Sequence, residues 1–320
     1  MIWTRTVVPW APTGSVDAAR RSWIAPWRVW NTALDHVYYD VGALSAEERL
    51  DLAAYARPEG AVLVVLPGGR GRRIRTLLPW EFVREQERRA GEAVDAVVVA
   101  GVGSSAVGTA ALARNVADAL GRPVAGIVSG MGVADVWSEA LGGWFVLGAA
   151  NAVRDAWARL LDAVDFQDHV RDPTSHREAA ERFEALEGPA SGFLFGSPDS
   201  TALLYLLLRL GERIRLVVGH SKGNYSIENA LEGWVSASDR ADTPLPAALC
   251  IVTLGAVVRF PPEFPRVHQF LGELDAFGLL NSRPGVDRIT VPGAWHTLNP
   301  ALPGHLSVAQ ALRRAGVGAS

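Results

Sequence analysis

Short, uninterrupted apolar runs alternate with helical patterns along most of the chain, and this alternation constrains the fold more than any other feature. Continuous apolar runs suit strands that are buried on both faces of a parallel sheet. The order of runs and helices predicts an α/β fold with an open, doubly wound, mostly parallel sheet. The expected strands are Ala61–Leu66, Val94–Ala100, Val124–Ser129, Ile214–Val218, Leu249–Leu254, Val267–Leu271 and Arg288–Val291. The expected helices are Ala106–Leu120, Ser200–Leu210, Asn224–Val235 and Val308–Arg314.

Two segments depart from this alternation. Residues 1–60 are rich in tryptophan and contain Ser45-Ala46-Glu47-Glu48, a capping box that predicts a helix running to Arg57. We expect them to form a helical preface whose tryptophans pack on the core rather than touch lipid or a polymer. Residues 131–198 hold many aromatic side chains but no convincing strand. Within a domain spanning residues 61–320, they are expected to form a helical cap or lid, or else a plain structural excursion.

Composition and charge exclude several classes of protein. The formal net charge of −3, without a basic run, argues against nucleic acid as a partner. No apolar stretch approaches the length that spans a bilayer, which argues against integral membrane association. The single cysteine, Cys250, cannot form an internal disulfide, and the first residues lack the layout of a secretory signal. A cytoplasmic protein without metal or organic cofactor is expected.

The sequence Gly219-His220-Ser221-Lys222-Gly223 matches the G-x-S-x-G pattern of a nucleophile elbow. An apolar run precedes it and a helical pattern follows it, which is the context that the pattern requires. Side chains two residues before and after the serine would clash in so tight a turn. Gly219 and Gly223 would therefore allow Ser221 to project toward a substrate as the nucleophile, with the helix N-terminus facing the reaction.

A serine hydroxyl needs a histidine base and a carboxylate that orients the imidazole. Asp275 follows a late strand and is the expected acid, with Glu273 and Asp287 as competitors. His296 follows the last expected strand and is the expected base. Its rivals are His305, at the start of the closing helix, and His220, which is expected to point away from the site.

Two backbone N–H groups should stabilise the oxyanion of a tetrahedral intermediate. Lys222 supplies the first candidate, because it follows the nucleophile, and Val102 the second, because its loop leaves an early strand. The same loop, Ala100-Gly101-Val102-Gly103-Ser104-Ser105, also fits a dinucleotide-binding fingerprint. The next expected strand ends without the acidic residue that would hold the ribose, so a nicotinamide-dependent oxidoreductase is the weaker interpretation.

The order Ser221, Asp275, His296, together with the loop around Val102, resembles the α/β-hydrolase superfamily, and its lipase and esterase branch most closely. The resemblance covers residue 61 to the end of the chain and implies an ester hydrolase. Many members carry His-Gly before the oxyanion residue, whereas Ala100 replaces that histidine here. The fragment Pro26-Trp27-Arg28-Val29-Trp30-Asn31 resembles intracellular proteins of polyhydroxyalkanoate metabolism, whose synthases have cysteine where this chain has Ser221.

The expected function is therefore hydrolysis of a carboxylic ester with an apolar acyl group, through an acyl-enzyme. Polyester oligomers and acyl thioesters are alternative substrates for the same groups. A catalytically inactive, hydrolase-like binding or scaffold protein is the alternative from another class, and it would show the three side chains far apart. The expected substrate pocket is lined by aromatic side chains of the cap and of the last loop: Trp137, Trp144, Phe145 and Trp295.

Overall fold

The computed structural model describes residues 34–54, 59–68, 74–88, 93–101, 104–129, 198–241, 246 and 248–318. The expectations for residues 1–33, for Val102 and for nearly all of the 131–198 insertion lie outside these ranges. Where the preface is described, it is helical at residues 34–38, followed by a 3₁₀ turn, η1 (Val41–Ala43), and by α2 (Ala46–Ala54).

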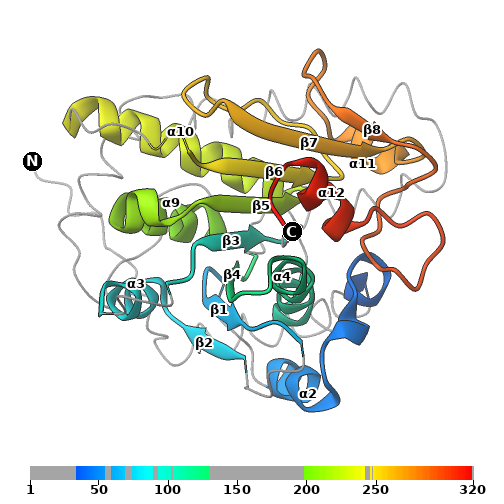
Figure 1. Ribbon diagram of the computed structural model, residues 1–320, viewed down its shortest axis with the longest axis horizontal. Helices are drawn as coiled ribbons and strands as arrows, with labels where there is room; N and C mark the ends of the chain where they lie inside the picture. The colour runs from blue at the N-terminus through cyan, green and yellow to red at the C-terminus, as the bar shows by residue number, and fades with distance from the viewer. Residues whose placement is uncertain are drawn as a thin grey trace, which may run out of the picture.

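The centre of the fold is an eight-stranded, mostly parallel sheet (Figure 1). Its spatial order is β2 (Arg75–Leu77), β1 (Val62–Val65), β4 (Val124–Ile127), β3 (Ala96–Val99), β5 (Leu216–His220), β6 (Cys250–Leu254), β7 (Arg266–Gly272) and β8 (Ile289–Val291). Strand β1 is antiparallel to both of its neighbours, β2 and β4, and the remaining pairs are parallel. The α/β class expected from the sequence is confirmed.

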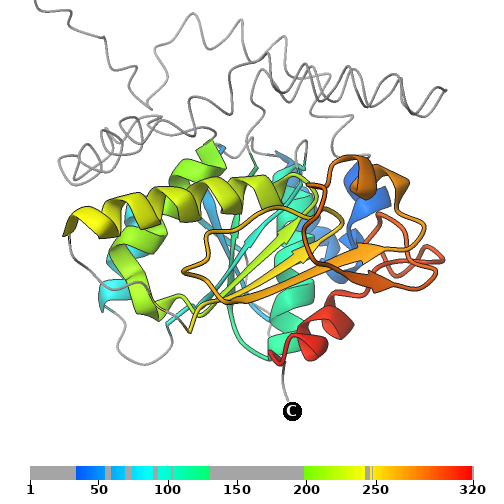
Figure 2. The ribbon, with the colours of Figure 1, turned by 90° about the horizontal axis from the view of Figure 1, so that it is seen from above.

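Helices cover both faces of the sheet, as Figures 1 and 2 show. One face packs on α4 (Ala106–Leu120), α2 and α12 (Val308–Arg314), and the other packs on α3 (Pro79–Arg88), α9 (Pro198–Leu210) and α10 (Gly223–Ala241). A second 3₁₀ turn, η2 (Gly211–Arg213), follows α9, and the short α11 (Ala276–Leu280) follows β7. Strands β1, β3, β5 and β6 are buried along their whole length, because helices cover both of their faces.

The described part of the N-terminal segment packs on α4. Tyr39, Val41, Leu44 and Leu52 belong to the same apolar cluster as the inner face of that helix. The predicted capping box is present at the start of α2: the Glu48 N–H donates to Ser45 Oγ at 3.1 Å, and the Ser45 N–H donates to Glu48 Oε2 at 2.8 Å. Glu48 also pairs with the largely buried Arg114 of α4, which fastens α2 to the core.

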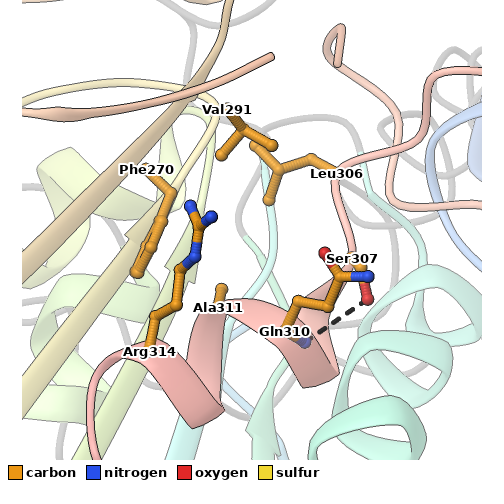
Figure 3. A pocket seen from close by; sticks show the side chains of 7 residues that line it. All are labelled: Phe270, Val291, Leu306, Ser307, Gln310, Ala311 and Arg314. Atoms are coloured by element: carbon orange, nitrogen blue, oxygen red, sulfur yellow. Dashed lines mark hydrogen bonds between the residues drawn. The ribbon is translucent and has the colours of Figure 1, made fainter. Parts of the chain in front are cut away.

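None of the described helices combines the length and hydropathy that a bilayer-spanning segment requires. A small hollow lies between α12 and the last two strands (Figure 3). Ser221, Asp275 and His296 are not among its lining residues, which are Phe270, Val291, Leu306, Ser307, Gln310, Ala311 and Arg314. The hollow is therefore separate from the site described next.

Candidate active site

Ser221 occupies a strained turn between β5 and α10. Its φ is 53°, and it is the sole non-glycine residue with a positive φ in the described part of the chain. Its N–H donates to the Leu254 carbonyl at 2.8 Å, which ties the turn to the end of the neighbouring strand β6. Left-handed backbone at a serine costs free energy and recurs where a side chain must project at an active site. The local geometry is that of the strand-turn-helix expected from the sequence.

Gly219 and Gly223 permit this turn for steric reasons. A Cβ on Gly219 would collide with Asn224 Oδ1 and lie 2.5 Å from Ile227 Cδ1. A Cβ on Gly223 would lie 2.5 Å from the carbonyl oxygens of Val99 and Ala100. Side chains at both positions would therefore clash, as expected from the sequence, and Gly223 also lets α10 begin directly against the end of β3.

Ser221, His296 and Asp275 form a continuous hydrogen-bonded chain. Ser221 Oγ lies 3.0 Å from His296 Nε2, and His296 Nδ1 lies 2.8 Å from Asp275 Oδ2 and 3.0 Å from Oδ1. All three residues are buried, with 8%, 5% and 3% of their surfaces exposed. With a proton on Nδ1 held by Asp275, Nε2 is free to accept the serine proton. An inactive scaffold would show these three side chains far apart, whereas here they are within hydrogen-bond distance of one another along the chain of contacts.

Asp275 is held by the helix that follows it. It is the N-cap of α11, where its Oδ1 accepts the Gly278 N–H at 2.5 Å. The competing residues lie elsewhere: Glu273 is exposed and accepts the Gly293 N–H, Asp287 is exposed, and His305 is half-buried. Of the alternatives weighed from sequence, the structure places Asp275 and His296 beside Ser221.

The loop after β3 adjoins the nucleophile. A Cβ on Gly101 would lie 3.2 Å from Ser221 Cβ, so the backbone approaches the serine closely. In the sheet, β3 lies between β4 and β5. The connection after β3 leads to β4 on one side of it, and the later strand β5 lies on its other side. The carboxyl ends of β3 and β5 therefore form a topological switch point, which is where ligands bind in open α/β sheets. Lys222 lies in the turn that starts α10, and the N-terminus of a helix is favourable for an anion.

Phe277 packs against His296, and other apolar side chains on the neighbouring segments are exposed. The Phe277 ring contacts His296 edge to face, with centroids 4.8 Å apart, and is 43% exposed. Leu274 and Leu280 are also exposed. Trp295 is 36% exposed and donates its indole N–H to the Pro303 carbonyl at 2.8 Å. The other predicted pocket residues, Trp137, Trp144 and Phe145, lie outside the described residues.

The sequence interpretation assigned no role to three buried polar residues at or beside the site: Asp35, Tyr39 and His220. Asp35 accepts the N–H groups of Ser105 and Gly108 and the Ser105 hydroxyl at the start of α4. His220 is 1% exposed, and its ring lies 4.9 Å from that of His296. No sequence pattern links the three, since their partners lie far away along the chain.

Burial raises the pKa of Asp35 from 3.8 to about 7, and its hydrogen bonds with Ser105 and Gly108 offset only part of that rise. The folded chain therefore binds this proton more tightly than the unfolded chain. The resulting stability is complete below pH 4 and is lost as the pH rises toward 7. Relative to Asp35→Asn, the free energy of unfolding of the parent is expected to fall over this range by at most about 1.4 kcal/mol per pH unit.

Urea unfolding of both chains at pH 5, 6 and 8 measures this difference. A difference that stays constant with pH would show that Asp35 titrates in its ordinary range. The other titratable groups are present in both the parent and Asp35→Asn, so their contributions cancel in the difference between the two free energies of unfolding.

Among the described residues, no group of three or more His, Cys, Asp or Glu side chains could hold a metal ion. No family model, curated protein or solved structure matches this chain. The arguments about function therefore rest on the geometry of the site.

Proposed function

We propose that this chain is a serine hydrolase that cleaves carboxylic esters through an acyl-enzyme intermediate. The observation that carries the proposal is the chain of hydrogen bonds from Ser221 Oγ through His296 to Asp275, with Ser221 in a strained turn after a central strand. The same hydrogen-bonded arrangement, from serine to histidine to carboxylate, recurs on unrelated folds as a nucleophile with its base and its orienting acid.

In this mechanism Ser221 Oγ attacks the ester carbonyl carbon while its proton passes to His296 Nε2. Asp275 stabilises the imidazolium that forms. Collapse of the tetrahedral intermediate breaks the bond to the alcohol, which leaves with the proton from His296. Water then attacks the acyl-serine with His296 again as base, and the carboxylic acid departs as Ser221 regains its proton.

The oxyanion of each tetrahedral intermediate requires preorganised N–H donors. We assign this role to the backbone N–H groups of Lys222 and Val102. In support, Lys222 lies at the start of α10, and the close approach of Gly101 to Ser221 brings the loop that continues to Val102 beside the nucleophile. The eight-stranded sheet with the serine after β5 is compatible with an α/β-hydrolase fold.

The exposed apolar side chains on and just before α11 favour an ester with an apolar acyl group. Phe277 of α11 packs edge to face against His296, and both Leu274, just before α11, and Leu280, at its end, are exposed. Such a surface binds hydrocarbon without fixing its length. Polyester oligomers and acyl thioesters present the same carbonyl chemistry and remain the alternative substrates.

Labelling by a fluorophosphonate probe tests the proposal. The parent is expected to form one covalent adduct, located on Ser221 by mass spectrometry of the digested chain, and Ser221→Ala is expected to form none. The alanine variant is expected to keep the fold, because it removes a single hydroxyl. An unlabelled parent that is well folded, or an alanine variant that labels as the parent does, would overturn the assignment.

A further inference from the structure

Residues 35–39, here called the clasp, bind the loop that carries His296. The backbone carbonyls of the clasp accept hydrogen bonds from three consecutive residues of that loop (Figure 1, blue segment beside the orange-red loop). The pairs are Thr297 Oγ1 to the Val37 carbonyl, Leu298 N–H to the Tyr38 carbonyl at 2.8 Å, and Asn299 Nδ2 to the His36 carbonyl at 2.7 Å. A segment some 260 residues away in sequence thus fixes the chain immediately after the base.

The side chains of the clasp bind the loop after β3. Tyr39 Oη accepts the Gly101 N–H at 2.7 Å, and Asp35 accepts the Ser105 N–H at 3.0 Å. These two bonds fasten both ends of the short segment that contains Val102. The clasp therefore contacts the two loops that must be aligned with Ser221, one for the base and one for an oxyanion donor.

A single chain of hydrogen bonds joins these loops through His220. Because Tyr39 Oη already accepts from Gly101, its own proton is available for His220 Nδ1, which lies 2.9 Å away. Nδ1 then accepts, so the imidazole carries its proton on Nε2 and donates it to the His296 carbonyl at 3.1 Å. This one tautomer of His220 completes every hydrogen bond of the network between the Gly101 N–H and the His296 carbonyl.

Both side chains of this network remain uncharged near neutral pH. Tyr39 and His220 are 3% and 1% exposed. Burial raises the pKa of Tyr39 above its usual range and, with the nearby His296, lowers the pKa of His220 well below its usual value. The hydrogen bonds therefore persist over the pH range in which a histidine base works.

We infer that Tyr39 and His220 are positioning residues, which hold the backbone of His296 and the loop at Gly101 in alignment with Ser221. The inference rests on the proposed hydrolase function. Asp275 orients the imidazole ring of His296, whereas His220 anchors its main chain, so the two contacts act on different parts of the base. A displacement of about 1 Å in a reacting group can lower a rate about 100-fold.

Tyr39→Phe tests the inference by removing the hydroxyl that joins Gly101 to His220. Its second-order rate constant for fluorophosphonate labelling is expected to fall about 10- to 100-fold at a temperature well below its unfolding midpoint. Tyr205→Phe is the matched control, since Tyr205 lies on α9 in the cluster on the opposite face of the sheet, and it is expected to label at the parental rate. Labelling of Tyr39→Phe at the parental rate would overturn the inference.

Conservative and non-conservative changes at His220 separate positioning from packing. His220→Gln retains an N–H donor for the His296 carbonyl, while His220→Leu fills similar space without one. The glutamine variant is expected to label at least 10-fold faster than the leucine variant. Equal rates in the two variants would show that the donor has no positioning role.

Histidine-selective ¹⁵N spectra of the full chain provide a readout that does not depend on activity. His220 is expected to show a proton on Nε2, without titration between pH 5 and 8, in the parent and in Ser221→Ala. An Nδ1 proton, or titration in this range, would overturn the network. Absence of labelling in the parent would instead overturn the hydrolase function, and the His220 spectrum would still decide the network.

Discussion

Replacement of Asp275 by asparagine is expected to lower the kcat of ester hydrolysis about 10⁴-fold while the chain stays folded. The Gly278 N–H donates to Oδ1 of residue 275, and an asparagine oxygen can still accept it. The amide NH₂ would then face His296 Nδ1, which would have to accept a hydrogen bond. The imidazole proton would move to Nε2 and point at Ser221 Oγ, where the base must be vacant.

Turnover of a nitrophenyl ester measures this effect, and the thermal unfolding midpoint verifies that the variant is folded. Asp287→Asn is the matched control, because Asp287 is an exposed aspartate on the segment between α11 and β8. It is expected to leave kcat unchanged. If Asp275→Asn retained a kcat within 10-fold of the parent, another group would have to orient His296.

The sequence predicts seven of the eight strands in the described part of the chain, including the exposed edge strand β8, and misses β2, α3 and α11. Strands β1, β3, β5 and β6 are buried along their length and mostly apolar, because both faces are covered, and each overlaps its predicted range. Strand β2, Arg75-Thr76-Leu77, was missed because it is short, lies at the edge of the sheet and is not fully buried, so it lacks the apolar run. The five-residue α11 is too short for helical periodicity to develop.

The triad candidates could be predicted because each follows a strand whose carboxyl end faces the same edge of the sheet. The hydrogen-bond network of Tyr39 and His220 could not be predicted in this way. Tyr39 and His220 are 181 residues apart, and their hydrogen bond depends on how the N-terminal segment packs, which no spacing rule encodes. The tryptophan-rich composition of the preface predicts apolar packing, whereas the polar contacts of its described part come from Asp35, Tyr39 and backbone carbonyls.

Alanine at position 223 is expected to damage both the site and the fold. Its Cβ would lie 2.5 Å from two backbone carbonyl oxygens, those of Val99 and Ala100, which belong to the end of a central strand and its exit. Backbone in a buried sheet cannot give way as a side chain can, so α10 would have to move away from β3 and carry Ser221 with it. We expect a loss of about 3 kcal/mol in the free energy of unfolding and labelling by a fluorophosphonate about 100-fold slower.

Gly233→Ala, ten residues further along the same helix, distinguishes this strain from a general effect of a methyl group on α10. A Cβ there would meet Leu204 Cδ2 at 2.9 Å, the end of a side chain that can change rotamer. Alanine also favours a helix interior over glycine by about 1 kcal/mol, which offsets the crowding. The free energy of unfolding of Gly233→Ala, measured in urea, is therefore expected to lie within about 1 kcal/mol of the parental value. If Gly223→Ala matched this control in stability and labelling rate, the close contact of α10 with β3 would not be what sets the geometry of Ser221.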